Sequence, residues 1–336
     1  MNRKNLTAGL LFAMMSSTAA FAETLIVSTN NPPSHYAVTQ GYEPFMECVT
    51  QKNVGLDFNF FPSSQIVSAK ASLDALNSNL VQISAVVTGT NSDKLPLANI
   101  AQLPNMGMTV RQMVDALNIV LADGGPMADE LKANHMVPLF INMYPPYQLG
   151  LKTGKINSME DFTSLKIRVN GGAPVFAVQS LNAVPVQMSA GDAYVGVQQG
   201  TIDGYMLALT SVDAYKLQEV TGSLTTNVNF SGGQVWVAMD DRYFDTLAPE
   251  KQQALLDCGQ QIQKSLSEYT DAMSDELIKQ FREEGVEMYE VSPELSAELD
   301  QVLQLAIDDY VNRLTELNLP AKEATEQYQA ALAASR

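Results

Sequence analysis

The stretch SLKIRVNGG, from Ser164 to Gly172, indicates how this chain is built. Apolar and polar residues alternate up to a Gly-Gly pair, which predicts a β-strand with one apolar face that ends in a turn. Arg168 lies near the end of this predicted strand. Because the chain holds 20 basic against 37 acidic residues, an arginine at this place is conspicuous and is our first candidate for a binding residue.

The first 22 residues predict a secretory signal peptide. A basic segment, Asn2 to Lys4, precedes a mostly apolar run from Leu6 to Ala20, and Ala20-Phe21-Ala22 fits an A-x-A cleavage site. The run is shorter than the ~20 residues of a membrane span, which disfavours the alternative of an uncleaved anchor. We therefore expect cleavage after Ala22 and export of the mature chain to a bacterial periplasm.

The charge of the mature chain limits its partners. Without Arg3 and Lys4, 18 basic residues face 37 acidic ones, a balance of −19. Such a charge argues against nucleic acid and anionic membrane surfaces as partners.

Strands and helices alternate along the mature chain, which predicts an α/β protein with largely parallel sheets. The length of 336 residues fits two domains. We expect the chain to cross between them near Tyr144–Tyr147 and again near Gly232–Gly233, and a helix from Pro249 to Glu284 to extend beyond one domain. The expected first domain is 23–145 with about 233–260, and the second is 146–232 with about 261–336, which includes the C-terminal helices.

The sequence contains no recognisable catalytic motif or metal-ligand cluster. Its two histidines, His35 and His135, are too few for a usual metal site, so we expect no metal, no cofactor and no enzymatic activity. Cys48 and Cys258 can form one disulfide or remain two buried thiols, and their spacing does not decide between these.

Five segments together resemble the solute-binding receptors of TRAP transporters, the tripartite ATP-independent periplasmic carriers. The strand around Arg168 is followed by Ala183-Val-Pro-Val-Gln-Met188 and then by Val197-Gln-Gln-Gly-Thr-Ile-Asp-Gly204. Phe60-Phe-Pro-Ser-Ser-Gln65 and the helix after Leu247-Ala-Pro-Glu250 agree more loosely. The resemblance implies a two-domain periplasmic binding protein fold with a ligand cleft between the domains and a long helix that spans both.

In the family, the arginine of this strand binds a ligand carboxylate, so the resemblance implies that role for Arg168. A guanidinium matches a carboxylate with two parallel hydrogen bonds. The alternative is a structural ion pair with a neighbouring acidic residue. The resemblance also implies a monomer whose closed, liganded form docks on membrane subunits of the transporter.

Two departures from the family pattern bear on the ligand. Leu207 stands where many relatives have asparagine, and Gln148 stands where some have a second arginine. Further candidates are polar residues at strand ends and nearby residues with apolar or amphipathic side chains. The full set of candidate binding residues is Arg168, Asn170, Gln148, Tyr147, Asn30, Thr88, Tyr205, Leu207, Gln234 and Trp236.

One strong cation among apolar walls favours a monocarboxylate with an apolar or aromatic body, such as a 2-oxo or hydroxy acid. The alternative is a polar, water-filled cleft with the aromatic residues in the cores. Two other functions stay open from sequence: a binding protein for an ATP-driven importer or sensor, and a periplasmic enzyme.

Overall fold

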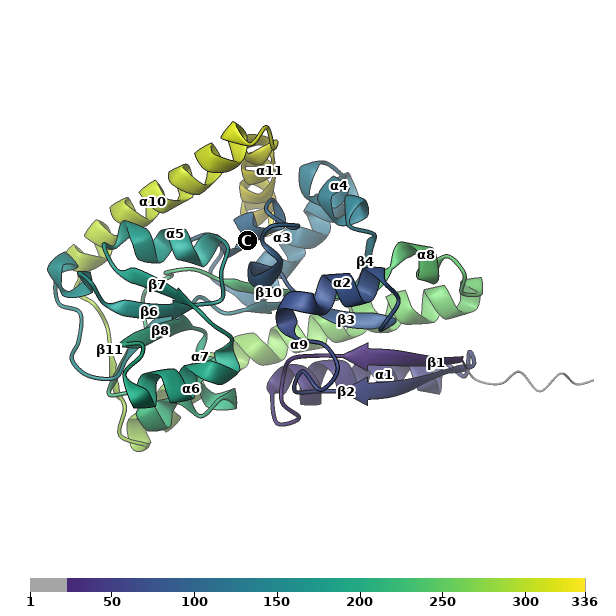
Figure 1. Cartoon of the computed structure of the whole chain (residues 1–336), viewed down its shortest axis with the longest axis horizontal. Coiled ribbons are helices and arrows are strands. Elements are labelled where there is room, and N and C mark those ends of the chain that lie inside the picture. Colours follow the sequence, from purple (N-terminus) through teal and green to yellow (C-terminus); the bar gives the residue numbers. More distant parts are fainter. Residues whose placement is uncertain (1–22, 336) are drawn as a thin grey trace, which may run out of the picture.

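The computed structural model describes residues 23–335, so the predicted signal peptide and its cleavage site lie outside the described residues. Within this range no helix is both long enough and apolar enough to cross a membrane. The chain forms two β-sheets that lie side by side along the long axis of the molecule, with helices around both (Figure 1).

The first sheet has five strands in the order β2-β1-β3-β10-β4. Strands β1 and β2 pair in parallel along their whole length, and β3 pairs in parallel with β1. The strands are β1 (Glu23–Ser28), β2 (Leu56–Phe61), β3 (Ile83–Val87), β4 (Met136–Tyr144) and β10 (Gly233–Asp240).

The second sheet has six strands in the order β11-β9-β5-β8-β6-β7. The strand that carries Arg168, β6, lies between β7 and β8 and is parallel to both. The strands are β5 (Gln148–Leu151), β6 (Lys166–Val169), β7 (Val184–Gln187), β8 (Gly204–Leu207), β9 (Ser223–Thr225) and β11 (Glu287–Tyr289).

Both sheets are mixed, so the expectation of largely parallel sheets is wrong. Strand β10 runs antiparallel to β3 and β4, and β5 runs antiparallel to β8 and β9. The reason is the path of the chain between the sheets. Strand β4 ends at the crossing and β10 begins there, with Gly233 paired to Tyr144, so the two strands must run in opposite directions.

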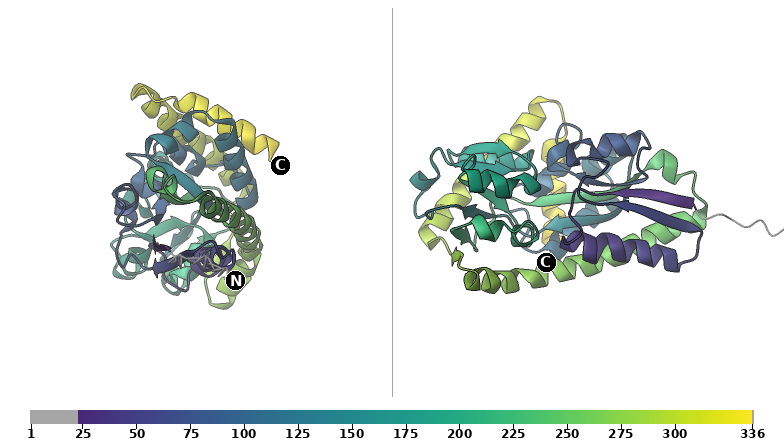
Figure 2. Two further views of the ribbon diagram at one scale, coloured as in Figure 1. Left: turned by 90° about the vertical axis from the view of Figure 1, so that its right-hand side faces the viewer. Right: turned by 60° about the horizontal axis from the view of Figure 1, so that its bottom comes forward.

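The chain passes between the two sheets more than once. It leaves the first sheet after β4, enters the second at β5 and returns at β10. Helix α9 (Pro249–Glu283) then contacts β4 of the first sheet and β11 of the second, and Figure 2 shows it running beneath both. Its apolar face joins core residues of both sheets in one cluster.

Sequence determines how α9 begins, ends and packs. Proline occupies its first turn, where no backbone hydrogen bond is lost, and Gly285 follows its end with φ +96°. A Cβ atom on Gly259 would lie 2.0 Å from the carbonyl oxygen of Leu139. Glycine at this position therefore lets the helix pack closely against β4.

The other helices complete the layers around the sheets. Helices α3, α4 and α11 pack together against one face of the first sheet, while α1 and α9 contact its other side. Because α11 contacts α3 and α4, this C-terminal helix lies with the first sheet. The remaining bounds are α1 (Glu43–Gln51), α2 (Ser72–Asn77), α3 (Val110–Asp123), α4 (Pro126–Ala133), α5 (Ala173–Ser180), α6 (Ala190–Gln199), α7 (Leu209–Ala214), α8 (Asp241–Phe244), α10 (Pro293–Glu316) and α11 (Ala321–Ala334).

Short helical turns connect several of these elements. They comprise a π-helical turn, η1 (Val38–Tyr42), and five 3₁₀ turns, η2 (Ala69–Ala71), η3 (Gly89–Asn91), η4 (Ala98–Gln102), η5 (Met159–Phe162) and η6 (Leu217–Val220).

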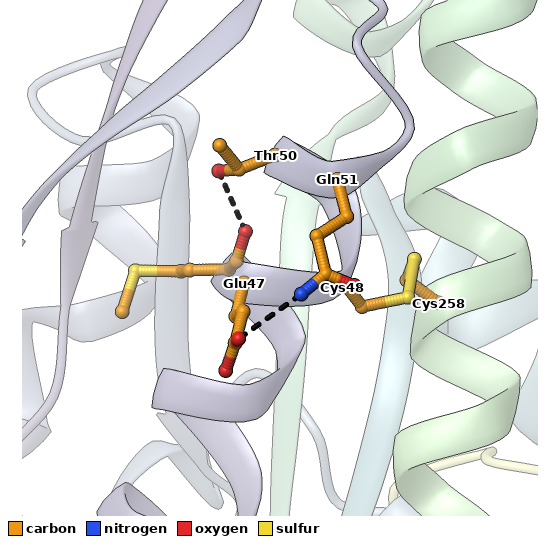
Figure 3. Close-up of a disulfide and its surroundings, with 6 residues drawn as sticks. Glu47, Cys48, Thr50, Gln51 and Cys258 are labelled. Carbon is orange, nitrogen blue, oxygen red and sulfur yellow. Dashed lines mark hydrogen bonds between the residues drawn. A yellow bond between two sulfur atoms is a disulfide. The ribbon is translucent and has the colours of Figure 1, made fainter.

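A disulfide joins Cys48 of α1 to Cys258 of α9 (Figure 3). The two Cα atoms are 5.8 Å apart although the residues are 210 positions apart in sequence. This resolves the choice that the sequence left open, and it fastens the first half of α9 to the first sheet.

Candidate functional site

Arg168 lies at the end of β6 and is almost fully buried, with 2% of its surface exposed. Its Nε donates a hydrogen bond to the carbonyl oxygen of Met188 at 3.0 Å. Its Nη1 is buried and has no hydrogen-bond partner among the described residues. Burial lowers the pKa of Arg168, and nearby Tyr147 and Tyr215 act in the opposite direction. An arginine nevertheless stays charged in a protein, so the site holds a buried cation.

No acidic side chain among residues 23–335 lies within ion-pair distance of Arg168, although Asp192 is close enough to raise its pKa. None of the ion pairs formed within residues 23–335 includes Arg168. The alternative of a structural ion pair therefore does not describe its surroundings in this structure. A buried charge without a partner is costly, and such a group is the natural anchor of an anion.

Arg168 contributes to the wall of a cavity of about 50 Å³ between the two sheets. The cavity adjoins a larger one of about 1120 Å³, and the two share wall residues that include Asn30, Asn170 and Tyr215. Both sheets supply residues to the inner wall, which is formed by Asn30, Ala69, Val87, Thr90, Tyr144, Tyr147, Arg168, Asn170, Ser189, Ala190, Leu207, Ser211, Tyr215, Gln234 and Val235.

Three tyrosines form an aromatic part of this wall. Burial raises the pKa of Tyr147 to about 12 and also raises the pKa values of Tyr144 and Tyr215. His35 packs behind them, with its ring centroid 5.7 Å from that of Tyr215, and burial lowers its pKa to about 3. These groups are therefore neutral near pH 7, and the guanidinium of Arg168 dominates the local charge.

Gln234, at the start of β10, adds a second donor from the first sheet. It is 1% exposed, and its Oε1 accepts a hydrogen bond from the hydroxyl of Thr88 at 3.3 Å. Its Nε2 has no partner among the described residues. Thr88 is not in the cavity wall, but its hydroxyl fixes the orientation of the Gln234 amide.

Six of the ten candidate residues line the inner cavity. They are Asn30, Tyr147, Arg168, Asn170, Leu207 and Gln234. Asn30, Arg168, Asn170 and Leu207 lie at or near the carboxyl end of a strand, as the rule for ligand sites in α/β sheets predicts. Tyr147 and Gln234 lie instead at the start of the antiparallel strands β5 and β10.

Besides Thr88, three candidates lie away from the cavity wall. Gln148 is bonded within the second sheet through Val228 and Thr225. Tyr205 bonds to Thr221 at 2.7 Å and is fully buried. Trp236 is packed in the core between the first sheet and its helices. Tyr205 and Trp236 are each two residues, about 7 Å, further into their strands than the wall residues Leu207 and Gln234.

Sequence reasoning missed several wall residues, including Tyr144, Tyr215, Ser189 and Ser211. Ser189 lies two residues beyond the end of β7, so the strand-end rule could have found it. Tyr215 follows the short helix α7 and carries no such signal.

The Gly171–Gly172 turn brings the two sheets' loops into contact next to the site. Both glycines have positive φ, +107° and +63°. A Cβ atom on Gly172 would lie 2.1 Å from Asn99 Oδ1, and one on Gly171 would lie 2.7 Å from the carbonyl oxygen of Gly89. Only glycine fits both the backbone conformation and the space, so this turn is shaped for contact across the cleft.

A binding cavity between two α/β sheets, with a buried cation in its wall, is the expected geometry of a solute receptor. The profile of bacterial extracellular solute-binding protein family 7 matches residues 27–313. This chain belongs to that family, which comprises the receptors of TRAP transporters.

The TRAP receptor is similar to several characterised proteins. It is 24% identical to the outer membrane transporter protein TsaT of Comamonas testosteroni, over 99% of each chain. It superimposes with a TM-score of 0.86 on a marine metagenome TRAP solute-binding protein in complex with meta-hydroxyphenylacetate, at 18% identity over 93% of this chain and 99% of the other.

A second solved structure is an extracytoplasmic solute receptor of Bordetella pertussis that binds pyroglutamic acid. Its TM-score is 0.83 at 17% identity, over 93% of this chain and 100% of the other. The expected two-domain periplasmic binding protein fold is thus confirmed. Because the family and these structural neighbours are solute receptors, the prediction that this protein is not an enzyme is also confirmed.

Proposed function

We propose that this TRAP receptor captures a small organic monocarboxylate at Arg168 and delivers it to the membrane subunits of its transporter. The observation that carries the proposal is the buried guanidinium without a carboxylate partner. A carboxylate in the cavity would offset the cost of burying this charge and match the planar donor fork.

Gln234 supports the proposal from the opposite side of the cleft. Its unpartnered Nε2 belongs to the first sheet, whereas Arg168 belongs to the second. A carboxylate has two oxygen atoms, so one anion can accept from both residues. Such an anion would stabilise a closed arrangement of the two sheets more than an open one.

The rest of the wall favours a ligand body with apolar surface. Val87, Leu207 and Val235 line the inner cavity together with three neutral tyrosines. The ligands named for the two structural neighbours, meta-hydroxyphenylacetate and pyroglutamic acid, each combine one carboxylate with a ring. We therefore propose a monocarboxylate with a ring or branched body, bound by Arg168, Gln234, Asn170, Asn30, Tyr147 and Leu207.

Closure and docking complete the proposed cycle. We propose two domains that meet at the crossings near 145 and 233, with α11 assigned to the first domain because it packs on α3 and α4. The receptor would act as a monomer, close on its ligand and present the closed form to the membrane subunits.

Calorimetric titration tests the proposal. Phenylacetate and isovalerate should bind more tightly than succinate and galacturonate. Arg168→Lys should weaken binding of the best monocarboxylate at least ~30-fold, about 2 kcal/mol, because an ammonium lacks the bidentate fork. Arg242→Lys is the matched control, since Arg242 is paired with Asp240 outside the cavity, and it should bind like wild type. The proposal fails if Arg168→Ala binds within about threefold of wild type.

A further inference from the structure

A chain of side-chain amides leads from the first sheet to Asn170 at the cavity. Asn99 donates through Nδ2 to the carbonyl oxygens of Leu95 at 2.8 Å and Thr88 at 3.2 Å. Its Oδ1 therefore accepts, and the donor is Nε2 of Gln102 at 3.0 Å. The free Oε1 of Gln102 faces Nδ2 of Asn170 at 3.5 Å.

This chain fixes which end of the Asn170 amide serves the ligand. Backbone carbonyls can only accept, so they set the orientation of Asn99, and each amide then sets the next. Asn170 directs its donor toward Gln102, which leaves Oδ1 as the free end. That oxygen is buried and has no partner among the described residues, and Asn170 lines both cavities beside Arg168.

From this arrangement we infer that Asn170 selects a carboxylate that carries a hydrogen-bond donor, such as a 2-hydroxyl group, next to its carboxylate. The inference rests on the proposed function, because it takes Arg168 as the carboxylate anchor. A hydroxyl on the ligand donates to Oδ1 of Asn170 and satisfies it. Asn30, from the first sheet, offers a second buried and unpartnered Oδ1 in the same wall.

The same geometry disfavours 2-oxo acids and acids without a substituent. A 2-oxo group has only acceptor electron pairs, so it would oppose the acceptor of Asn170. An unsubstituted acid would leave that oxygen buried without a partner, and sites built around a hydrogen bond reject ligands that lack it. The amide chain should therefore distinguish 2-hydroxy, 2-oxo and unsubstituted acids, although all three carry the same carboxylate group.

The amide chain also links this selection to contact across the cleft. Asn99 and Gln102 belong to η4 beside the first sheet, whereas Asn170 follows β6 of the second. Gly89 approaches the Asn170 amide closely, because a Cβ atom there would lie 2.6 Å from Nδ2. Asn170 is therefore oriented by partners that reach it only when the two sheets are together.

Matched triplets of acids test the inference by calorimetry on the mature protein. Each triplet holds a 2-hydroxy, a 2-oxo and an unsubstituted acid: lactate, pyruvate and propionate; 2-hydroxyisovalerate, 2-oxoisovalerate and isovalerate; mandelate, phenylglyoxylate and phenylacetate. In the triplet that binds most tightly, the hydroxy acid should bind at least ~10-fold more tightly than the other two, about 1.4 kcal/mol.

Variants assign that preference to Asn170. Asn170→Ala should reduce the ratio within the triplet to below about threefold. Asn312→Ala is the matched control, because Asn312 is exposed on α10 and lies outside both cavities, so this variant should keep the wild-type ratio. Arg168→Lys should weaken all three acids together and leave their ratio unchanged.

Each contrary result has a separate meaning. Equal or tighter binding of the 2-oxo or unsubstituted acid to wild type overturns the inference, and so does an unchanged ratio in Asn170→Ala. Unchanged affinities in Arg168→Lys overturn the proposed anchor instead, while the ratios still decide the role of Asn170. If no triplet binds to wild type, both the monocarboxylate proposal and this inference fail.

Discussion

Arg168, in the cavity between the sheets, and Arg242, at the distal end of the first sheet, have opposite surroundings. Arg242 donates to Asp240 at 2.9 Å and to the carbonyl oxygen of Asn77 at 2.8 Å, and much of its side chain is exposed. Nearby, Glu23 accepts from Lys251 at 2.6 Å and from Tyr243 at 2.7 Å. Arg168 is more deeply buried and has only one carbonyl partner.

Because of this difference, we expect the distal region to contribute mainly to stability and the cavity mainly to ligand binding. At the distal end, the charged side chains form ion pairs within the chain, Arg242 with Asp240 and Lys251 with Glu23. In the cavity, several donors and acceptors are buried without partners among the described residues, which lowers the stability of this arrangement of the two sheets. Changes at the two regions should therefore have different effects on folding and on affinity.

The largest expected effect is removal of the disulfide beside the paired region. The double variant Cys48→Ala, Cys258→Ala should lower the free energy of unfolding by about 2–5 kcal/mol, because the unfolded chain gains freedom. Ligand affinity should stay within about twofold of wild type, since the bridge lies outside the cavity wall. Urea titration with calorimetry checks both values, and a large affinity loss would show that the two regions are not independent.

Replacing the unpaired arginine should have a different kind of effect. Arg168→Met removes the charge whose burial opposes closure without ligand, so the ligand-free closed form should gain at least ~10-fold in population, about 1.4 kcal/mol. Small-angle scattering should then show the ligand-free variant as more compact than ligand-free wild type. An expanded ligand-free variant, equal to ligand-free wild type, would contradict this account.

A smaller effect is expected from Asp240, the carboxylate that pairs with Arg242. Asp240 also accepts from the backbone N–H of Arg242 and caps α8. Asp240→Asn keeps the cap and loses only the ion pair, so the free energy of unfolding should fall by about 0.5–1 kcal/mol, whereas Asp240→Ala should lose about 1–2 kcal/mol. Thermal unfolding of both variants, with unchanged ligand affinity, checks this order.

The smallest expected effect is a difference in the pH at which the two regions contribute to the free energy of unfolding. His35 has a native pKa of about 3 against 6.5 unfolded, so the native state binds fewer protons and unfolding becomes easier as pH falls below 6.5. Between pH 7 and 6 this contributes a loss of about 0.7 kcal/mol. The pKa values of Glu23 and Asp240 are lowered, so their contributions are lost only at more acidic pH, below about 4.5 and 3.8.

The variant His35→Asn isolates this contribution. Burial also raises the pKa of Glu130 to about 7, which makes the native state more stable on acidification and opposes the effect of His35. The difference in slope between wild type and His35→Asn, measured by urea titration at pH 7 and 6, should therefore be the ~0.7 kcal/mol of His35. Equal slopes would mean that His35 has the same pKa in the native and the unfolded protein, which would contradict this account.

Much of the fold followed from sequence because local pattern dictates local structure. The alternation around Arg168 predicted β6, and the apolar stripe from Pro249 with its terminal glycine predicted α9 to within a residue at its C-terminal end. The antiparallel strands were missed because strand direction depends on how the chain returns between sheets. The short strands β9 and β11 offer three residues each, too few for a periodic signal.

The sequence by itself determined the strand that carries Arg168, the glycine turn beyond it and the family to which the chain belongs. Only the tertiary structure decided that Arg168 forms no ion pair with any described acidic residue, that Cys48 meets Cys258, and that Gln234 rather than Trp236 reaches the cavity. The physical reason is the distance along the sequence over which each interaction acts. Hydrogen-bond periodicity and turn conformation act over a few residues, whereas the pairing of a charge or a thiol depends on groups up to 210 positions away.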